Sequence, residues 1–172
     1  PNVTFKLIEG DTHTLQHDLN ERDIEFAIVR LPLDMTNFDS IPLPNDHFVA
    51  VVPEAWKGDL PKENLTMKIL ATMPIMLLHR AGLNEPGLYE VVLDRFRNMG
   101  LVPHVVCDSP DAAMLLALVN AGVGAAILPM STMEAFSPEG IIIMTIEDAI
   151  IQSESAIIWL KDCYLSKKAL CF

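Results

Sequence analysis

A helix with almost no polar face constrains the fold of this chain more than any other feature. Residues 112–120 read Ala-Ala-Met-Leu-Leu-Ala-Leu-Val-Asn, which is apolar around nearly the whole helical circumference. A helix of this kind is buried on several sides, so we expect it to lie between two layers with Met114 in the core. Gly122 ends the helix, and an apolar strand at 123–128 follows and stops at Pro129. The sequence therefore predicts a layered α/β domain.

Alternating strand and helix patterns extend along the rest of the chain. Period-two or wholly apolar runs predict strands, and stripes at helical spacing predict helices. We expect strands at 3–8, 24–29, 47–52, 75–78, 102–107, 141–146 and 156–160, and helices around Leu15 and Leu19, at 64–70 and at 85–99. The first strand–helix–strand series predicts parallel strands with a right-handed crossover. Residues 31–45 and 54–61 are expected to be connections without regular structure.

Composition excludes several classes of protein. The chain has 172 residues, of which 51% are hydrophobic, and this suits one domain or two small lobes rather than a disordered segment. The net charge is −11, and its dispersed basic residues cannot replace the counterions of DNA phosphates. No apolar run reaches the roughly 18 residues of a membrane span, and no signal peptide opens the chain, so we expect a cytoplasmic protein without membrane contact.

Cysteine and histidine usage gives no indication of a metal site. Cys107, Cys163 and Cys171 are odd in number and match no zinc-binding spacing. Free thiols in a reducing compartment are therefore expected, with Cys107 buried in its strand. His13 and His17 lie one helical turn apart, but no third ligand is evident, so we interpret them as part of a solvated face. We expect no cofactor and no metal.

The segment 112–129 also carries the most specific motif. Its sequence, AAMLLALVNAGVGAAILP, resembles the "LVAAGxGxAxLP" signature of LysR-type transcriptional regulators. Other segments resemble the family in the right order: Leu7-Ile8-Glu9-Gly10, Ile24-Glu25-Phe26-Ala27-Ile28, residues 43–53, residues 96–103 and Trp159-Leu160. The resemblance is to the effector-binding domain and covers nearly the whole chain.

The resemblance implies a fold and a function. The fold is periplasmic-binding-protein-like (type II), with two Rossmann-like lobes joined by a hinge. Lobe one would hold residues 1–55 and 155–172, and lobe two residues 56–154. A small effector would bind in the cleft between lobes of a homodimer or homotetramer, and DNA would be bound by an N-terminal winged helix-turn-helix domain that this chain lacks. Family members have a further strand and helix before the position of Pro1, so we expect truncation at both ends.

Two residues of lobe one are candidates for the effector site. Thr12 is expected at a helix N-terminus, where backbone N–H groups and the helix dipole favour an anion. The alternative is a plain N-cap hydroxyl. Arg30 follows a buried strand, at the end where α/β sheets bind ligands, and its guanidinium suits a carboxylate. The alternative is a solvated surface side chain.

Six candidates lie in lobe two, at strand ends and helix starts. They are His79, Arg80, Asn84, Gly87, Ser109 and Pro129. Arginine, histidine and a helix N-terminus together suit an organic acid, which is the effector class we expect. Ser109 is also interpreted as a helix N-cap, His79 as a half-buried strand residue, and Glu85 as an acid that favours the helix dipole.

No catalytic constellation is evident in the sequence. It contains no nucleophile elbow, no phosphate-binding loop and no arguable cysteine–histidine pair, so we do not expect an enzyme. A solute-binding protein of the same fold is the alternative function, and it predicts ligand binding without oligomerisation. Fold by itself does not exclude an enzyme either.

Overall fold

The chain divides into two compact units. A computed structural model describes residues 4, 6–62, 64–79, 88–136, 139–167 and 169. Unit 1 comprises residues 1–45 and 153–172, and unit 2 comprises residues 46–152. The first boundary therefore lies between Asn45 and Asp46 rather than at residue 55. Strand β3 (Asp46–Pro53) belongs to unit 2 because it pairs with two strands of that unit.

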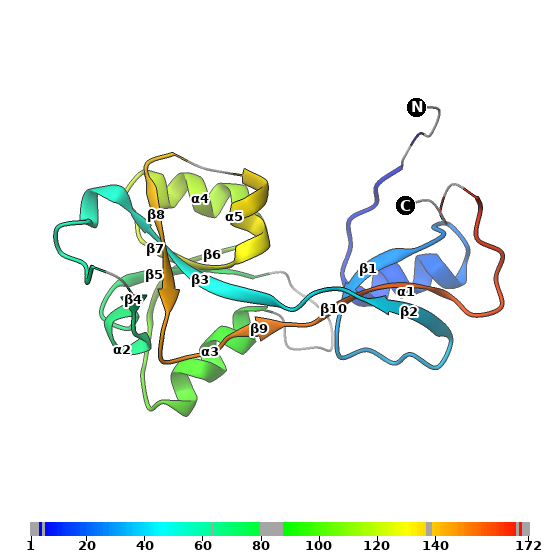
Figure 1. The fold of residues 1–172 in the computed structure, drawn as a ribbon, viewed down its shortest axis with the longest axis horizontal. Helices are drawn as coiled ribbons and strands as arrows, with labels where there is room; N and C mark the ends of the chain where they lie inside the picture. Colours follow the sequence, from blue (N-terminus) through cyan, green and yellow to red (C-terminus); the bar gives the residue numbers. More distant parts are fainter. Residues whose placement is uncertain are drawn as a thin grey trace. The chain divides into compact units, whose positions relative to one another are not determined.

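Unit 2 is built on a mixed sheet (Figure 1). Its strands follow the order β4-β8-β3-β7-β5-β6, and β9 also pairs with β3. The central strand β3 is antiparallel to β7 and β8, whereas β5 is parallel to β6 and β7. The bounds are β4 Asn64–Leu65, β5 Pro74–Leu78, β6 His104–Ser109, β7 Ala125–Pro129, β8 Ile141–Ile146 and β9 Gln152–Ser153.

Helices cover both faces of this sheet. Figure 1 shows α4 and α5 on one side of the sheet and α2 and α3 on the other. Their bounds are α2 Met67–Leu70, α3 Leu88–Asn98, α4 Ala112–Asn120 and α5 Met130–Phe136, and a short 3-10 turn, η1, spans Glu54–Trp56. Phe96 of α3, Leu115 and Val119 of α4, and Ile127 and Leu128 of β7 are among the buried side chains of this core.

The predicted burial of α4 between two layers is wrong. Leu115, Leu116 and Val119 pack inward, but the side chain of Met114 is 53% exposed. The helix packs on one face of the sheet, so only the stripe of side chains that faces the sheet is covered. Its composition is apolar all round chiefly because alanines occupy outer positions, and an exposed alanine presents little apolar area.

Unit 1 is a small sheet covered by one helix. Strand β10 (Ser155–Leu160) pairs antiparallel with β1 (Ala27–Arg30) on one side and with β2 (Phe38–Pro42) on the other. Helix α1 (Thr12–Asn20) packs on β1 and β10. The core contains Leu19 of α1, Ala27 and Val29 of β1, Phe38 of β2, and Ala156 and Ile158 of β10.

Two sequence predictions for unit 1 are wrong. The described residues of 3–8 form no strand, and Leu7 is 92% exposed. The expected parallel pairing is also absent from the described residues, because β1 pairs antiparallel with β10. A period-two pattern specifies which face of a strand is apolar, but it does not supply the neighbour that completes the hydrogen bonds. For the same reason β2 was missed inside the proline-containing segment 31–45.

The structure also differs from the sequence prediction in the burial of Cys107 and in the bounds of several elements. Cys107 is half-buried rather than buried, because β6 stands at the end of the strand order. Strand β1 begins at Ala27 rather than at residue 24, and residues 64–70 form β4 and then α2, with Thr66 as the N-cap. Helix α5 was not predicted.

The two glycines of the 112–129 motif serve different purposes. Gly122 has φ +79°, and its N–H donates to the Val119 carbonyl at 2.9 Å, so it ends α4 in a left-handed conformation. Gly124 lies where β7 begins beside β5, and a Cβ there would stand 2.7 Å from the Pro74 carbonyl oxygen. The second glycine therefore allows two backbones to approach closely.

We expect Gly124→Ala to destabilise the chain. The added methyl would contact backbone, which cannot rotate away, and overpacking of this kind costs about 1–3 kcal/mol. Urea unfolding followed by circular dichroism measures the effect. Gly58→Ala is the matched control because a Cβ at Gly58 meets nothing within 4 Å. Equal stabilities of the two variants would contradict the close approach.

Candidate functional site

The carboxyl ends of three strands in unit 2 form one edge of the sheet, which we call the strand-end edge. β5 is parallel to β6 and β7, and these strands end at Leu78, Ser109 and Pro129. Small ligands bind outside this kind of edge in α/β sheets, where loops and helix N-termini meet. The structure therefore places His79, Ser109 and Pro129 at one edge of the sheet, and their binding of a ligand stays a prediction.

His79 is held in place by two neighbouring elements. Its backbone N–H donates to the Ser109 carbonyl at 2.9 Å, and its Nδ1 atom lies 3.6 Å from Oδ2 of Asp108 on β6. The imidazole also stacks on the Tyr89 ring of α3, with ring centroids 4.6 Å apart and planes inclined by 27°. The half-buried ring is thus oriented, and Nε2 is the nitrogen that does not face Asp108.

Aspartates cap the two helices that begin at the strand-end edge. Asp111 caps α4, accepting a hydrogen bond from the Ala113 N–H at 2.8 Å. Ser109, which we also expected to be the N-cap, instead accepts from the Asp111 N–H through its hydroxyl at 3.1 Å. At α5, Asp46 accepts from the N–H of Ser131 at 3.2 Å and from its hydroxyl at 2.6 Å.

These caps determine the electrostatics of the edge. The carboxylates of Asp46, Asp108 and Asp111 lie near it, and two of them occupy helix N-termini that would otherwise attract an anion. His79 is the one side chain at this edge, among the described residues, that we predicted to recognise a negative group. The predicted cation Arg80 lies outside the described residues, as do Asn84, Glu85 and Gly87. Pro129 is buried and pairs with Phe48, so it shapes the edge through its backbone.

The candidates of unit 1 occupy the ends of α1 and β1. Thr12 is the first residue of α1 and half-buried, but the N-cap is Asp11, which accepts from the Thr14 N–H at 2.7 Å. A carboxylate therefore already occupies this helix N-terminus. Arg30 is exposed at the last position of β1, opposite Ser155 of β10.

Several residues that form the candidate sites were not predicted from the sequence. Tyr89 and Asp108 orient His79, and Asp46 caps α5, which begins far along the chain at Met130. The Ser109-Pro110-Asp111 segment contained the signal for a cap, but the choice between its two capping side chains needed the structure. Among the described residues, no group of three or more histidine, cysteine, aspartate or glutamate side chains could hold a metal ion. His13 and His17 are both exposed.

The cap of α1 makes its stability dependent on pH. Hydrogen bonds from the backbone N–H and then the hydroxyl of Thr14 hold the pKa of Asp11 below its ordinary value. This contribution to stability is complete above the ordinary aspartate pKa of about 3.9 and is lost as the pH falls through the lowered value. The stability difference between the native chain and Asp11→Asn, which caps without a charge, should therefore shrink at acid pH. A Thr14 amide NMR signal that does not titrate in this range would contradict the cap.

The cap of α4 allows a second prediction. Asp111→Ala removes the acceptor for the Ala113 N–H and should lower the free energy of unfolding by about 1 kcal/mol. Asp111→Asn keeps an acceptor and should cost only a few tenths of that amount. Urea unfolding of both variants measures the difference, and equal losses would refute the capping role.

Comparison with known proteins identifies the family of this architecture. The family model described as "LysR substrate binding domain" matches residues 1–172. The chain is 29% identical over 172 residues to the HTH-type transcriptional regulator BsdA of Bacillus subtilis, covering 98% of this chain and 57% of BsdA. It is 26% identical to the HTH-type transcriptional regulator BudR of Raoultella terrigena, covering 92% of this chain and 54% of BudR. The chain thus spans just over half the length of these relatives.

Solved structures share the fold. The effector-binding domain of QuiR in complex with shikimate superposes with a TM-score of 0.71 at 18% identity, covering 94% of this chain and 74% of that domain. Full-length CbnR in complex with its target DNA gives a TM-score of 0.79 at 19% identity, covering 96% of this chain and 56% of CbnR. The architecture is therefore the periplasmic-binding-protein-like type II fold of LysR effector-binding domains. No described helix is long and apolar enough to cross a membrane. The chain belongs to the LysR substrate binding domain family.

Proposed function

We propose that this chain is the sensing part of a transcriptional regulator, and that its effector is a small organic acid which also carries hydrogen-bond donors. The observation that carries the proposal is the oriented His79 ring at the strand-end edge of unit 2. A side chain held by both an aspartate and an aromatic ring is pre-organised, so little entropy is lost when a ligand binds to it.

The charges at the edge narrow the effector class. Asp46, Asp108 and Asp111 would repel a di- or tricarboxylate, but they can accept hydrogen bonds from hydroxyl groups. A single carboxylate on the ligand would accept a hydrogen bond from the His79 ring, or pair with one of the predicted cations, Arg30 or Arg80. The complex of QuiR with shikimate, a hydroxylated monocarboxylic acid, supports this class by analogy of fold.

In the complete protein, effector binding would be coupled to the binding of DNA. The curated relatives are named as helix-turn-helix regulators and are almost twice as long as the matched region. We propose that a DNA-binding domain of that kind is joined to this one in a homodimer or homotetramer, and that effector binding shifts how the assembly presents it. Because the relatives are named as regulators, catalysis and solute carriage are less favoured functions for this chain.

A thermal-shift screen of the chain tests the effector class. Shikimate and other hydroxylated monocarboxylic acids should raise the melting temperature, because a ligand at 100 times its Kd stabilises by about 2.7 kcal/mol. Matched di- and tricarboxylates should stabilise less, owing to the aspartates of the edge. The screen is repeated with the complete regulator, in which the effector should also change the affinity for promoter DNA.

Substitutions locate the site of any stabilising compound. Arg30→Gln, His79→Gln and Arg80→Gln should each reduce the shift, whereas Lys57→Gln, an exposed cation remote from the strand-end edge, should not. Stabilisation by neutral or cationic compounds alone would contradict an acid effector. Retention of the full shift in all three variants would place the site elsewhere.

A further inference from the structure

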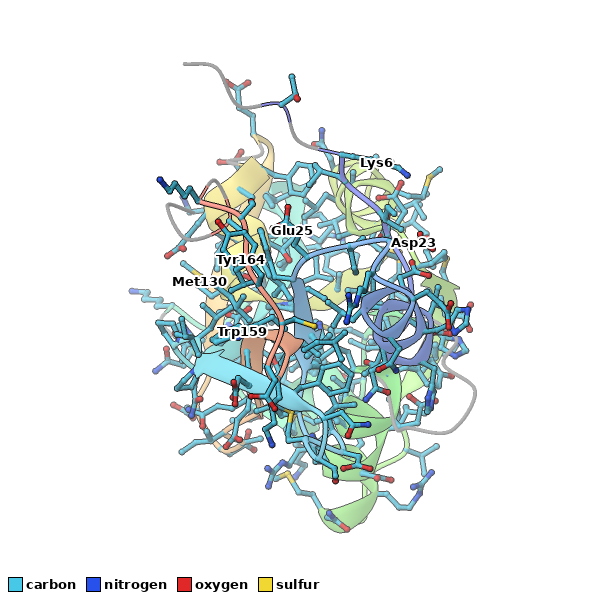
Figure 2. All side chains as sticks on the ribbon, turned by 90° about the vertical axis from the view of Figure 1, so that its right-hand side faces the viewer. Lys6, Asp23, Glu25, Met130, Trp159 and Tyr164 are labelled. Atoms are coloured by element: carbon cyan, nitrogen blue, oxygen red, sulfur yellow. The ribbon has the colours of Figure 1, made fainter. Side chains whose placement is uncertain are left out.

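Unit 1 contains a pocket that none of the proposed effector residues lines. Its volume is about 150 Å³, and it lies where α1 ends, beside the end of β10 and the segment that follows. Glu25 and Tyr164, both labelled in Figure 2, belong to its wall. The pocket is formed entirely by residues of unit 1, so it is independent of the strand-end edge of unit 2.

The pocket as a whole has room for about one ring, and part of its lining is apolar. Leu19, Ile24, Leu160 and Leu165 supply apolar surface, and Leu19 reaches the core of unit 1. Apolar cavities of about 150 Å³ hold a benzene molecule. An occupant with an apolar body of roughly six carbon atoms therefore matches this surface, and its burial would be favoured by the hydrophobic effect.

A cation and an anion stand separately at the same pocket. Arg22 has φ +64°, a turn conformation fixed where its N–H donates to the Leu19 carbonyl at 3.1 Å. Its guanidinium makes no ion pair within the described part of the chain, including with Glu25. Glu25 is held through Oε2, which accepts from the Ser166 N–H at 2.9 Å, and its other oxygen remains as an acceptor.

We propose that this pocket binds a small apolar carboxylic acid that also carries a hydrogen-bond donor. The carboxylate would pair with Arg22 in the bidentate geometry that guanidinium groups favour, and the donor would bond to Glu25. The apolar body would cover the leucine and isoleucine side chains of the floor. Two sources share this chemistry, namely apolar α-amino acids, whose donor is an ammonium group, and hydroxylated aromatic acids, whose donor is a hydroxyl.

Cys163 provides a reporter within the pocket. This half-buried thiol lines the pocket, whereas the half-buried Cys107 lies on β6 in unit 2. The chain is alkylated with iodoacetamide with and without L-leucine or 4-hydroxybenzoate, and the modified peptides are quantified by mass spectrometry. Either probe, if bound here, should slow alkylation of Cys163 at least about threefold and leave Cys107 unchanged. Calorimetry on the same samples gives the affinity.

Variants separate recognition from folding. Arg22→Asn removes the guanidinium but keeps a residue that tolerates positive φ, and it should weaken binding at least about tenfold. Lys62→Asn removes an exposed charge outside the pocket and should leave the affinity unchanged. Cys163→Phe fills the pocket and should abolish binding with the melting temperature preserved. Methyl 4-hydroxybenzoate, which lacks the carboxylate, should bind no better to the native chain than to Arg22→Asn.

The outcomes are distinct from those of the effector screen. Protection by leucine alone assigns the amino-acid source, and protection by 4-hydroxybenzoate alone assigns the aromatic source. The proposal is overturned if neither probe protects Cys163 at millimolar concentration, or if Arg22→Asn and Lys62→Asn bind equally well. His79 lies in unit 2, whereas the pocket lies in unit 1. His79→Gln should therefore leave binding of the probes to the pocket unchanged, even if it abolishes the response to the effector.

Discussion

The pairing of β10 with β1 on one side and β2 on the other holds unit 1 together. Ala156 and Ile158 come from the far end of the chain and complete a core whose other members lie before residue 39. Without β10, the two strands would have no neighbour in the described residues, and α1 would have little apolar surface to cover. In the chain, unit 2 is therefore inserted between the two segments of unit 1. Pairing these segments closes a loop of more than a hundred residues, which carries an entropic cost.

Unit 2 also pairs distant segments, because β3 lies between β7 and β8, and it depends in addition on close packing of its strands. Its strands β5 and β7 approach so closely that Gly124 has no room for a Cβ beside the Pro74 carbonyl. That approach accompanies the parallel pairing of β5 with β7, and the ends of these two strands, Leu78 and Pro129, form part of the strand-end edge. Gly124 belongs to the 112–129 motif that resembles the family signature. This motif therefore contributes to the close strand packing at the base of the candidate site.

Carboxylates at the starts of three helices give the candidate sites their electrostatic character. Asp11, Asp46 and Asp111 each satisfy N–H groups that would otherwise attract an anionic ligand. Helix N-termini alone would thus not account for recognition of the proposed acid effector. On the proposed function, histidine or arginine side chains would supply the attraction, and the aspartates would accept hydrogen bonds from donor groups of the ligand.

The sequence by itself determined the family, the α/β class and most strands of unit 2. Apolar runs such as 75–78 and 141–146 are long and uniform enough to specify strands locally, and the position of His79 follows from where the first of these strands ends. Only the tertiary structure decided that β10 separates β1 from β2, that α4 exposes one face, and that Asp46 caps a helix far along the chain. These features depend on contacts between distant segments, whereas periodicity reports only the face that a segment prefers to bury.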